Sequence, residues 1–458
     1  MNAATTIAGV KDGVVLSPEF AEEYLARWNL KVLYDLRGFF IGSGCGSVKN
    51  DVYRWTVREY LTKGLCSSRL ICLYEDAFHV RNNGNIRYVV TRDCAVMNRA
   101  FVFDLSPWGD EKPADDPNQP LGEDLRTYKL ILEEMLRQSD GKRMTELAGF
   151  FSFSKYSNVP DHKSIHDPVP TEWETVFLIS PYNCYQNTVA HDCYNQSFHS
   201  HFPFAPLKQH RPKSNPRLEG KIYLCFHMSD YDSTTPLYDF LPNFWSDDSR
   251  GKIPLAWGIN PNLIETYPDI VTYFYRTATE NDYFVSDASA AGYFNPNRVQ
   301  KQYLPPLIKH NKHFFEQTDM SIAPMVLDWD EPTDAVKDAF THFSPDGFAT
   351  IVLDFHGKRG KPPRPHVWKG MPVLEMLNTA CHTSDPNLIS ELVHKSIKED
   401  SLDSTRFYYF RIVWVRPRII VEVVESLHKA HPELNFEVVD PYTFFKLFKK
   451  TFSSSGNC

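Results

Sequence analysis

The feature that most constrains this chain is a repeated pattern of short apolar runs that begins after Arg99. Each run is rich in β-branched or aromatic residues, and longer segments of helical or loop character separate the runs. The runs span residues 100–103, 148–151, 176–179, 222–226, 253–257, 283–285, 323–327, 350–353, 410–413 and 436–439. Continuous apolar runs joined by long crossovers are typical of parallel strands buried on both faces. We therefore expect a parallel (β/α) barrel-like domain.

The segment before this pattern has a different organisation. Ser17 is a good N-cap for a helix over residues 17–28, which leads into an expected strand at 31–34. A second helix over 51–62 leads into a strand at 69–73. This order of elements predicts a small α/β unit.

Length supports a division into domains, because 458 residues are too many for one ordinary core. The pattern of apolar runs places the boundary just before Arg99. The expected fold class is therefore α/β, with a small α/β domain over residues 1–98 and a barrel-like catalytic domain over 99–458.

Polar and aromatic residues follow most of the expected strands directly. The carboxyl ends of barrel strands converge on one face, where the chemistry of such folds is placed. The residues at these exits include Asp104, Trp108, Lys155, Tyr182, Asn183, Asp230, Tyr231, Asp232, Trp257, Asn260, Asp287, Ser289, Tyr293 and Trp414. Their number favours an active site at that face.

The sharpest local feature is the pair Asp230 and Asp232, which lie two positions apart just past a strand. If the backbone stays extended there, the two carboxylates share a side. Paired carboxylates suit hydrolysis of a glycosidic bond. They also suit a divalent cation, with His227 or a distant histidine as a further ligand, and an Asx-turn that closes the loop is a third interpretation.

Composition and motifs exclude several classes of function. The net charge of −8 argues against a nucleic-acid partner, and no stretch of about 18 apolar residues indicates a membrane span. No signal peptide is recognised at the N-terminus, which favours the cytoplasm unless the chain is a trimmed secreted protein. No cofactor motif is present, since the glycines at 42, 44 and 46 lack the G-x-G-x-x-G spacing. A divalent cation is the one cofactor left open, and the oligomeric state is not predicted.

Residues 279–296 resemble the signature segment of the GxGYxYP family, whose members are described as putative glycoside hydrolases. Stretches around Asp104, Asp230 and Trp257 also resemble the family, so the similarity covers about residues 31 to 447. Within the motif, Gly292, Tyr293 and Pro296 match. Ala290 replaces the first glycine and Asn295 replaces the second tyrosine, which implies a reshaped pocket wall.

These observations predict a glycoside hydrolase, or another carbohydrate-active hydrolase, that acts through carboxylates on the barrel. Asp230 and Asp232 are the expected centre, and Asp104 and Asp287 are candidates for the second carboxylate, in one shared cavity. An inverting mechanism is slightly favoured, because carboxylates from separate strands leave room for a water molecule. The expected substrate-binding residues are Trp108, Lys155, Tyr182, Asn183, Asn195, His199, Tyr231, Trp257, Ser289, Gly292 and Tyr293.

Two other functions stay open. A metal-dependent deacetylase-like hydrolase would place Asp230, Asp232 and either His199 or His201 around a cation, although no recognised zinc spacing is present. A carbohydrate-binding relative that lost its chemistry with the motif changes is the non-enzymatic alternative.

Overall fold

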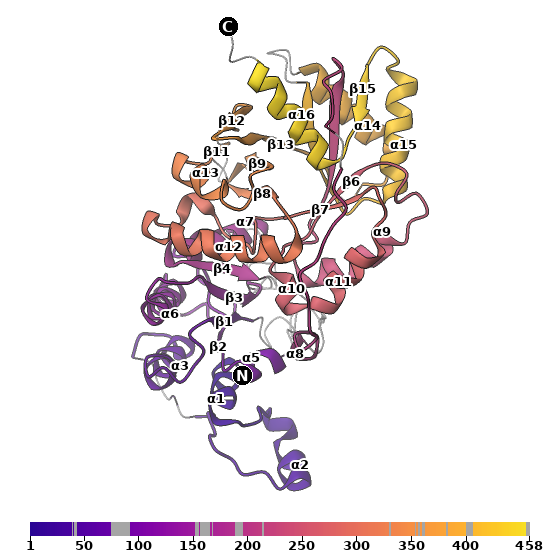
Figure 1. Ribbon diagram of the computed structural model, residues 1–458. Coiled ribbons are helices and arrows are strands. Elements are labelled where there is room, and N and C mark those ends of the chain that lie inside the picture. Colours follow the sequence, from indigo (N-terminus) through magenta and orange to yellow (C-terminus); the bar gives the residue numbers. More distant parts are fainter. Residues whose placement is uncertain are drawn as a thin grey trace. The chain divides into compact units, whose positions relative to one another are not determined.

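The chain divides into two compact units, residues 1–198 and 199–458. The computed structural model (Figure 1) describes residues 1–38, 40, 44–74, 92–151, 155, 165–166, 168–187, 196–212, 215–328, 331–352, 354–355, 358–359, 362–381, 383–399 and 406–454. The division therefore falls well after the predicted boundary at residue 98.

The first unit contains a small parallel sheet. Its strand order is β2-β1-β3-β4, with all neighbours parallel. The strands are β1 (Leu70–Leu73), β2 (Phe101–Phe103), β3 (Thr145–Gly149) and β4 (Cys184–Asn187). The runs expected at 100–103 and 148–151 thus contribute to this sheet rather than to the barrel. The alternation of strand and helix is the same in both units, so it does not by itself reveal which sheet a strand joins.

Helices make up much of the rest of the first unit. They are α1 (Asn2–Lys11), α2 (Pro18–Trp28), α3 (Val48–Thr56), η1 (Val57–Leu61), α5 (Asp93–Met97), α6 (Glu123–Ser139), α7 (Pro168–Ile179) and η4 (Ser180–Tyr182), and α8 (Gln196–His199) follows at the division. The helix predicted over 17–28 is confirmed, and the one over 51–62 begins three residues earlier, at Val48. Two predicted strands are wrong: residues 31–34 form none, and 176–179 belong to α7. The second error reflects a short apolar run, which fits a buried helix as well as a strand.

The second unit contains a nearly closed parallel barrel. The strand order is β7-β6-β5-β14-β13-β9-β8, β15 also pairs with β5, and β12 pairs antiparallel with β13. The strands are β5 (Ile222–Ser229), β6 (Leu255–Gly258), β7 (Asp282–Val285), β8 (Ile322–Asp328), β9 (Gly347–Val352), β12 (His366–Trp368), β13 (Met371–Cys381), β14 (Phe407–Val413) and β15 (Phe436–Val438), beside the short hairpin of β10 (Asp354–Phe355) and β11 (Lys358–Arg359). The predicted α/β class with a barrel-like domain is confirmed.

The seam of the barrel lies between β7 and β8. The Ser286 N–H donates to the carbonyl of Ile322 at 3.2 Å, which joins the end of β7 to β8. The Gln209 side chain fills part of the seam: its Oε1 accepts from the Phe284 N–H at 2.9 Å, and its Nε2 donates to the Phe284 carbonyl at 3.0 Å. A side-chain amide thus takes the place of a neighbouring strand along part of β7.

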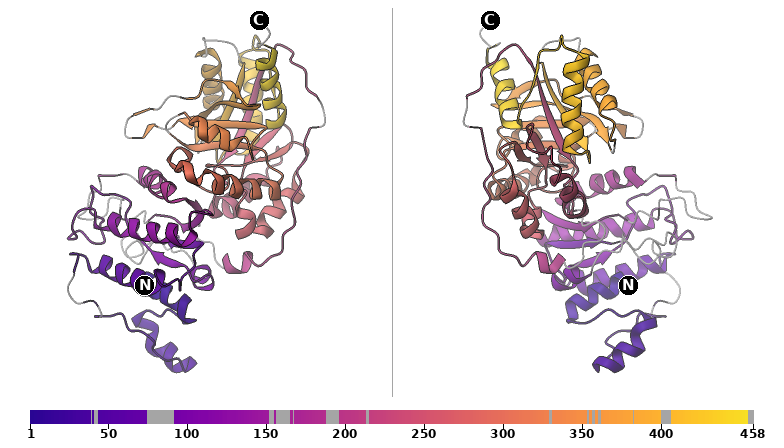
Figure 2. Two further views of the ribbon diagram at one scale, coloured as in Figure 1. Left: turned by 60° about the vertical axis from the view of Figure 1, so that its left-hand side comes forward. Right: turned by 90° about the vertical axis from the view of Figure 1, so that its right-hand side faces the viewer.

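Helices and short turns connect and cover the strands. They are η5 (Pro236–Phe240), α9 (Leu241–Trp245), α10 (Leu263–Thr266), α11 (Pro268–Thr277), η6 (Pro296–Arg298), η7 (Lys301–Tyr303), α12 (Leu304–Thr318), α13 (Asp334–Phe340), α14 (Pro386–Glu399), α15 (Pro417–Ala430) and α16 (Pro441–Ser454). Figure 2 shows α14 and α15 side by side. Within the described residues, none of the helices combines the length and the apolar character that a bilayer crossing requires.

The barrel core changes character along the strands. Alternate residues of β5, β14 and other strands pack with aromatic residues of α16, including Tyr223, Cys225, Tyr409, Phe444 and Phe448. Because side chains alternate along a strand, the next positions on the same face of β5 after Cys225 are His227 and Ser229. The apolar core therefore gives way to polar groups at the carboxyl ends of the strands.

Candidate active site

The end of β5 positions the two aspartates that the sequence singled out. His227 and Ser229 are completely buried, and the chain then turns at Asp230, whose φ of 70° is rarely adopted by residues other than glycine. The turn ends the strand and leaves the Asp230 side chain 30% exposed. Asp232 is partly exposed as well.

Asp287, just after β7, is buried and tied to the end of β5. Its Oδ2 accepts from the Asp230 N–H at 2.6 Å, and its Oδ1 accepts from the Ser229 hydroxyl at 3.0 Å and from the Ala288 N–H at 2.9 Å. The His227 Nε2 lies 3.5 Å from the same carboxylate. Burial opposes ionisation, but His227, Arg411 and these hydrogen bonds hold the pKa of Asp287 below its ordinary value. Asp287 is therefore a charged crosslink between two strands.

Arg411 in β14 joins the same network from the other side of β5. Its Nε donates to the Ser229 hydroxyl oxygen at 3.0 Å, Nη1 donates to Asn378 at 3.0 Å, and Nη2 forms an ion pair with Asp230. The Trp414 indole N–H also donates to the Asp230 carbonyl at 2.9 Å. The sequence analysis missed Arg411 and Asn378. The available signal was a charged residue inside an otherwise aromatic and aliphatic strand.

Two carboxylates share one hydroxyl group in this network. The Ser229 Oγ lies 3.0 Å from Asp230 Oδ1 and 3.0 Å from Asp287 Oδ1, so these two oxygens are separated by about 6 Å at most. Inverting glycosidases need about 6.5–9.5 Å between their carboxyl groups. This limit concerns one oxygen of each side chain and not the spacing of the two carboxyl groups, so the inverting mechanism stays a prediction.

The loop after β7 is held by groups distant in the sequence. Ala290 and Gly292 have φ values of 106° and 103°. The Ala291 N–H donates to the Asn311 side chain at 2.8 Å, and His310 Nε2 lies 2.8 Å from the Ala291 carbonyl. Burial lowers the pKa of His310 to about 4, so this imidazole is neutral at neutral pH and acts as a hydrogen-bond donor. Helix α12 thus fixes the loop that carries the predicted motif.

The predicted sugar-stacking rings in this unit are buried. Trp257 is fully buried, and its indole N–H donates to Asp282 at 2.8 Å, which makes it part of the barrel wall. Tyr231 packs on Trp257 and Tyr293 is 5% exposed. The hydroxyls of Tyr231 and Ser289 are buried and make no hydrogen bond within the described part of the chain.

Several predicted site residues belong to the first unit. Asp104 accepts from the Tyr53 hydroxyl and from Lys155, whose Nζ also lies 2.9 Å from Asp115. Asn183 occupies a turn and donates to the Arg143 carbonyl at 2.8 Å.

Other predicted residues have local roles. The Trp108 indole N–H donates to Thr171 at 2.9 Å, and Tyr182 ends the short helix η4. In the second unit, His199 pairs with Asp269 at 2.8 Å. Asn195 lies outside the described residues. A cavity shared by Asp104, Asp230, Asp232 and Asp287 stays a prediction.

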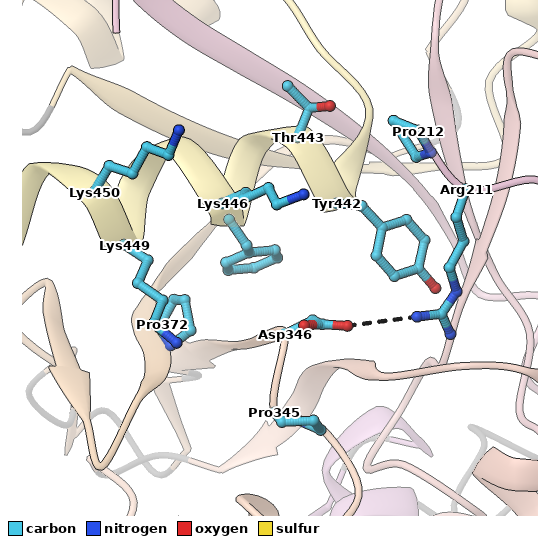
Figure 3. Close-up of a pocket in the computed structure, with 11 residues that line it drawn as sticks. Arg211, Pro212, Pro345, Asp346, Pro372, Tyr442, Thr443, Lys446, Lys449 and Lys450 are labelled. Atoms are coloured by element: carbon cyan, nitrogen blue, oxygen red, sulfur yellow. Dashed lines mark ion pairs between the residues drawn. The ribbon is translucent and has the colours of Figure 1, made fainter. Parts of the chain in front are cut away.

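A separate cavity of about 430 Å³ lies near the amino ends of the barrel strands. Figure 3 shows Arg211 and Asp346 facing each other in it, below the lysines of α16. Its lining includes Lys446, Lys449, Lys450 and Tyr442, and none of the predicted site residues. The carboxyl-end network, not this cavity, therefore contains the predicted carboxylates.

Comparison with protein families identifies the second unit. Residues 220–449 match the model described as the GxGYxYP putative glycoside hydrolase C-terminal domain. The chain belongs to this family. The matched range contains Asp230, Asp287 and Arg411, so their network lies within the C-terminal domain of this GxGYxYP protein.

One solved structure supports the same fold. A putative hydrolase from Bacteroides thetaiotaomicron VPI-5482 matches with a TM-score of 0.68 and 17% identity, over 98% of this chain and 77% of that one. A putative polysaccharide deacetylase from Mycobacterium smegmatis gives a TM-score of 0.33 and 11% identity, over 54% of this chain and 96% of that one. At 17% identity the first match establishes the fold only. No curated protein sequence matches the chain.

The structure also explains one departure from the GxGYxYP motif. Ala290 stands at the first glycine position of the motif and keeps a φ of 106°, which strongly favours glycine. The backbone therefore retains the glycine conformation although the side chain has changed. The second glycine position, Gly292, has a similar φ. Alanine at position 290 therefore places backbone strain in this loop.

Proposed function

We propose that this protein hydrolyses glycosidic bonds and that Asp230 is the carboxylate that meets the sugar. The observation that carries the proposal is the exposure pattern of the network. Asp287 is fully buried and the Arg411 side chain is 10% exposed, whereas the Asp230 side chain is 30% exposed. Asp230 is thus the accessible tip of a buried polar network in a family named for glycoside hydrolysis.

The remaining members of the network have positioning roles in this proposal. Arg411 fixes the direction of the Asp230 carboxylate, and the Trp414 indole fixes its backbone. Asp287 holds the turn through the Asp230 N–H and has no exposed surface for a sugar. Positioning of this kind lowers the entropic cost of reaching a reactive geometry.

Glycoside hydrolysis needs a second carboxyl group, and we assign it to Asp232. One carboxyl protonates the leaving oxygen while the other attacks the sugar or activates water. Asp232 is partly exposed and lies two residues after Asp230, whereas both Asp104 and Asp287 are buried.

The test is a screen of the purified full chain against polysaccharides and aryl glycosides, with and without EDTA. Once a substrate is found, Asp230→Asn is expected to lower turnover by about 10²-fold or more, because a catalytic carboxylate is lost while size is kept. Asp239→Asn, an exposed aspartate on η5, is the matched control and should leave turnover unchanged. Melting temperatures of both variants should stay close to that of the wild type.

The outcomes separate the alternatives. Near wild-type turnover in Asp230→Asn would refute the assignment of Asp230. Loss of activity in EDTA, restored by a divalent cation, would favour the metal-dependent hydrolase instead. Sugar binding without any turnover in the wild type, retained in Asp230→Asn, would favour a non-catalytic carbohydrate-binding protein.

A further inference from the structure

Two histidines and a glutamate converge on the outer helices of the barrel unit, away from the network at the strand ends. They are His394 on α14, and His431 and Glu433 just after α15. Each offers one donor atom, and these atoms all lie within 4.8 Å of one another. Among the residues that the structure describes, this is the group of acidic, histidine and cysteine side chains that meets such a criterion.

The packing of α14 against α15 brings the three residues together. Near the start of α14, Asn387 approaches Ser426 of α15 at 3.5 Å. About two turns further along α14, the imidazoles of His394 and His431 stack with ring centroids 3.5 Å apart and planes inclined by 14°. Nδ1 of His431 also lies 3.4 Å from the Glu433 carboxylate. The cluster is therefore part of a regular helix–helix contact.

The donor types indicate which ion would bind. Imidazole nitrogen and carboxylate oxygen suit zinc and neighbouring transition metals, whereas calcium and magnesium prefer oxygen ligands alone. We propose that His394, His431 and Glu433 bind a zinc-class divalent cation, with water completing the coordination. Nothing in the proposed glycosidase mechanism requires this ion, so each proposal can be tested independently of the other.

Binding needs a modest rearrangement. Zinc with nitrogen and oxygen ligands at about 2.0–2.2 Å brings ligand atoms to about 3.4 Å from one another. The side chains must therefore close by about 1 Å, and the stacked rings must tilt so that both lone pairs face the ion. The His431 and Glu433 side chains are 26% and 65% exposed, which leaves them room to move.

The ion would act as a clip between two helices. α14 precedes β14 in the chain and α15 follows it, so the clip would link the two helices that flank the strand carrying Arg411. Lys398, one turn after His394, is the nearby cation that opposes binding. We therefore expect an affinity in the micromolar range rather than the tighter binding of a buried structural site, with a stabilising effect on the second unit.

The test is titration of the tag-free, EDTA-treated full chain with zinc chloride in competition with a chromophoric chelator. The wild type should bind one zinc ion per chain at this site, and saturating zinc should raise the melting temperature by about 5 °C. His394→Ala and Glu433→Ala should each weaken that binding by about tenfold or more. His313→Ala is the matched control, because His313 pairs with Glu265 on the surface at 3.6 Å and, within the described part of the chain, belongs to no group of three donors.

A second measurement does not depend on any variant. Addition of Co²⁺ to the wild type should give the visible absorption of a low-symmetry site with nitrogen ligands, distinct from that of the aquated ion. The proposal is overturned if the wild type binds no zinc more tightly than the His394→Ala variant does. An unchanged Co²⁺ spectrum in the presence of protein would also overturn it.

Discussion

Each unit contains a buried network of aspartates and cationic side chains. The two networks differ in whether one carboxylate is exposed to solvent. In the first unit, Lys49 and Lys155 pair with Asp104, Asp115 and Asp124, and every one of these side chains is less than one-fifth exposed. In the barrel unit, Arg411 and His227 surround Asp287 and Asp230, and Asp230 reaches the surface.

This difference in exposure indicates that buried charges have different roles in the two units. In the first network, each carboxylate oxygen of Asp104 accepts a hydrogen bond, from Tyr53 or Lys155, and the side chain is only 4% exposed, so a substrate has little access to it. In the second network, the buried members orient one accessible carboxylate. We infer that the Asp104 network serves stability, whereas the Asp230 network serves chemistry.

The largest effect is expected for Lys155→Met. This change leaves Asp104 and Asp115 without their shared cation in a buried site, which typically costs about 3–5 kcal/mol of unfolding free energy. Denaturant unfolding followed by circular dichroism measures the loss. Arg37→Met, which removes an exposed partner of Asp35, is the control and should show no measurable change. A Lys155→Met variant that is stable but has lost turnover would show that the Asp104 network serves catalysis rather than stability.

The next effect concerns Asp287→Asn, which should destabilise the barrel unit by about 2–3 kcal/mol at neutral pH because a charged acceptor is lost. The pKa of Asp287 is depressed in the folded state, so its stabilising contribution exists above the unfolded pKa of about 3.9 and is lost as the pH falls through the lower folded value. The difference between wild type and variant should therefore stay constant from pH 7 to pH 5 and shrink below about pH 4. A difference that grows on acidification would contradict the assigned charge.

A smaller effect is expected at the seam of the barrel. Gln209→Ala leaves the N–H and carbonyl of Phe284 without their side-chain partner, which should cost about 1–3 kcal/mol. Gln302→Ala on the exposed turn η7 is the control and should change stability by less than about 0.5 kcal/mol. Equal stability of the two variants would show that the seam does not depend on Gln209.

The smallest effect has the opposite sign. Ala290→Gly should stabilise the protein by about 1 kcal/mol, because glycine adopts a φ of 106° without steric cost. The same replacement at Ala335 on α13 should destabilise by a similar amount, since glycine is unfavourable within a helix. Thermal unfolding of the two variants gives the comparison. Destabilisation by both would mean that the Ala290 methyl contributes more packing than strain.

The two units also show which features of the fold and of the site could be predicted from the sequence. The barrel class and the motif loop were predictable because they depend on local patterns, namely apolar runs and a signature segment. At Asp230 a turn was one of three interpretations, and the extended backbone that would put Asp230 and Asp232 on one side is not found, since Asp230 has a φ of 70°. The domain boundary was not predictable, since spacing alone does not reveal which sheet a strand such as β2 joins. Arg411 was missed because it comes from the middle of a strand far along the chain. The parallel pairing of β14 with β5 sets Arg411 beside His227, and from there its Nε reaches the Ser229 hydroxyl.

Gln209 has a further consequence beyond stability. A barrel that is not fully hydrogen-bonded at its seam leaves strand edges with unpaired backbone groups, and such edges can template pairing with a second chain. At Phe284 those groups are already occupied by the Gln209 amide, which also donates to the Asp319 carbonyl at 2.8 Å. An incoming strand would have to displace both contacts to add to β7. One glutamine side chain thus covers part of the edge of the strand that precedes the motif loop.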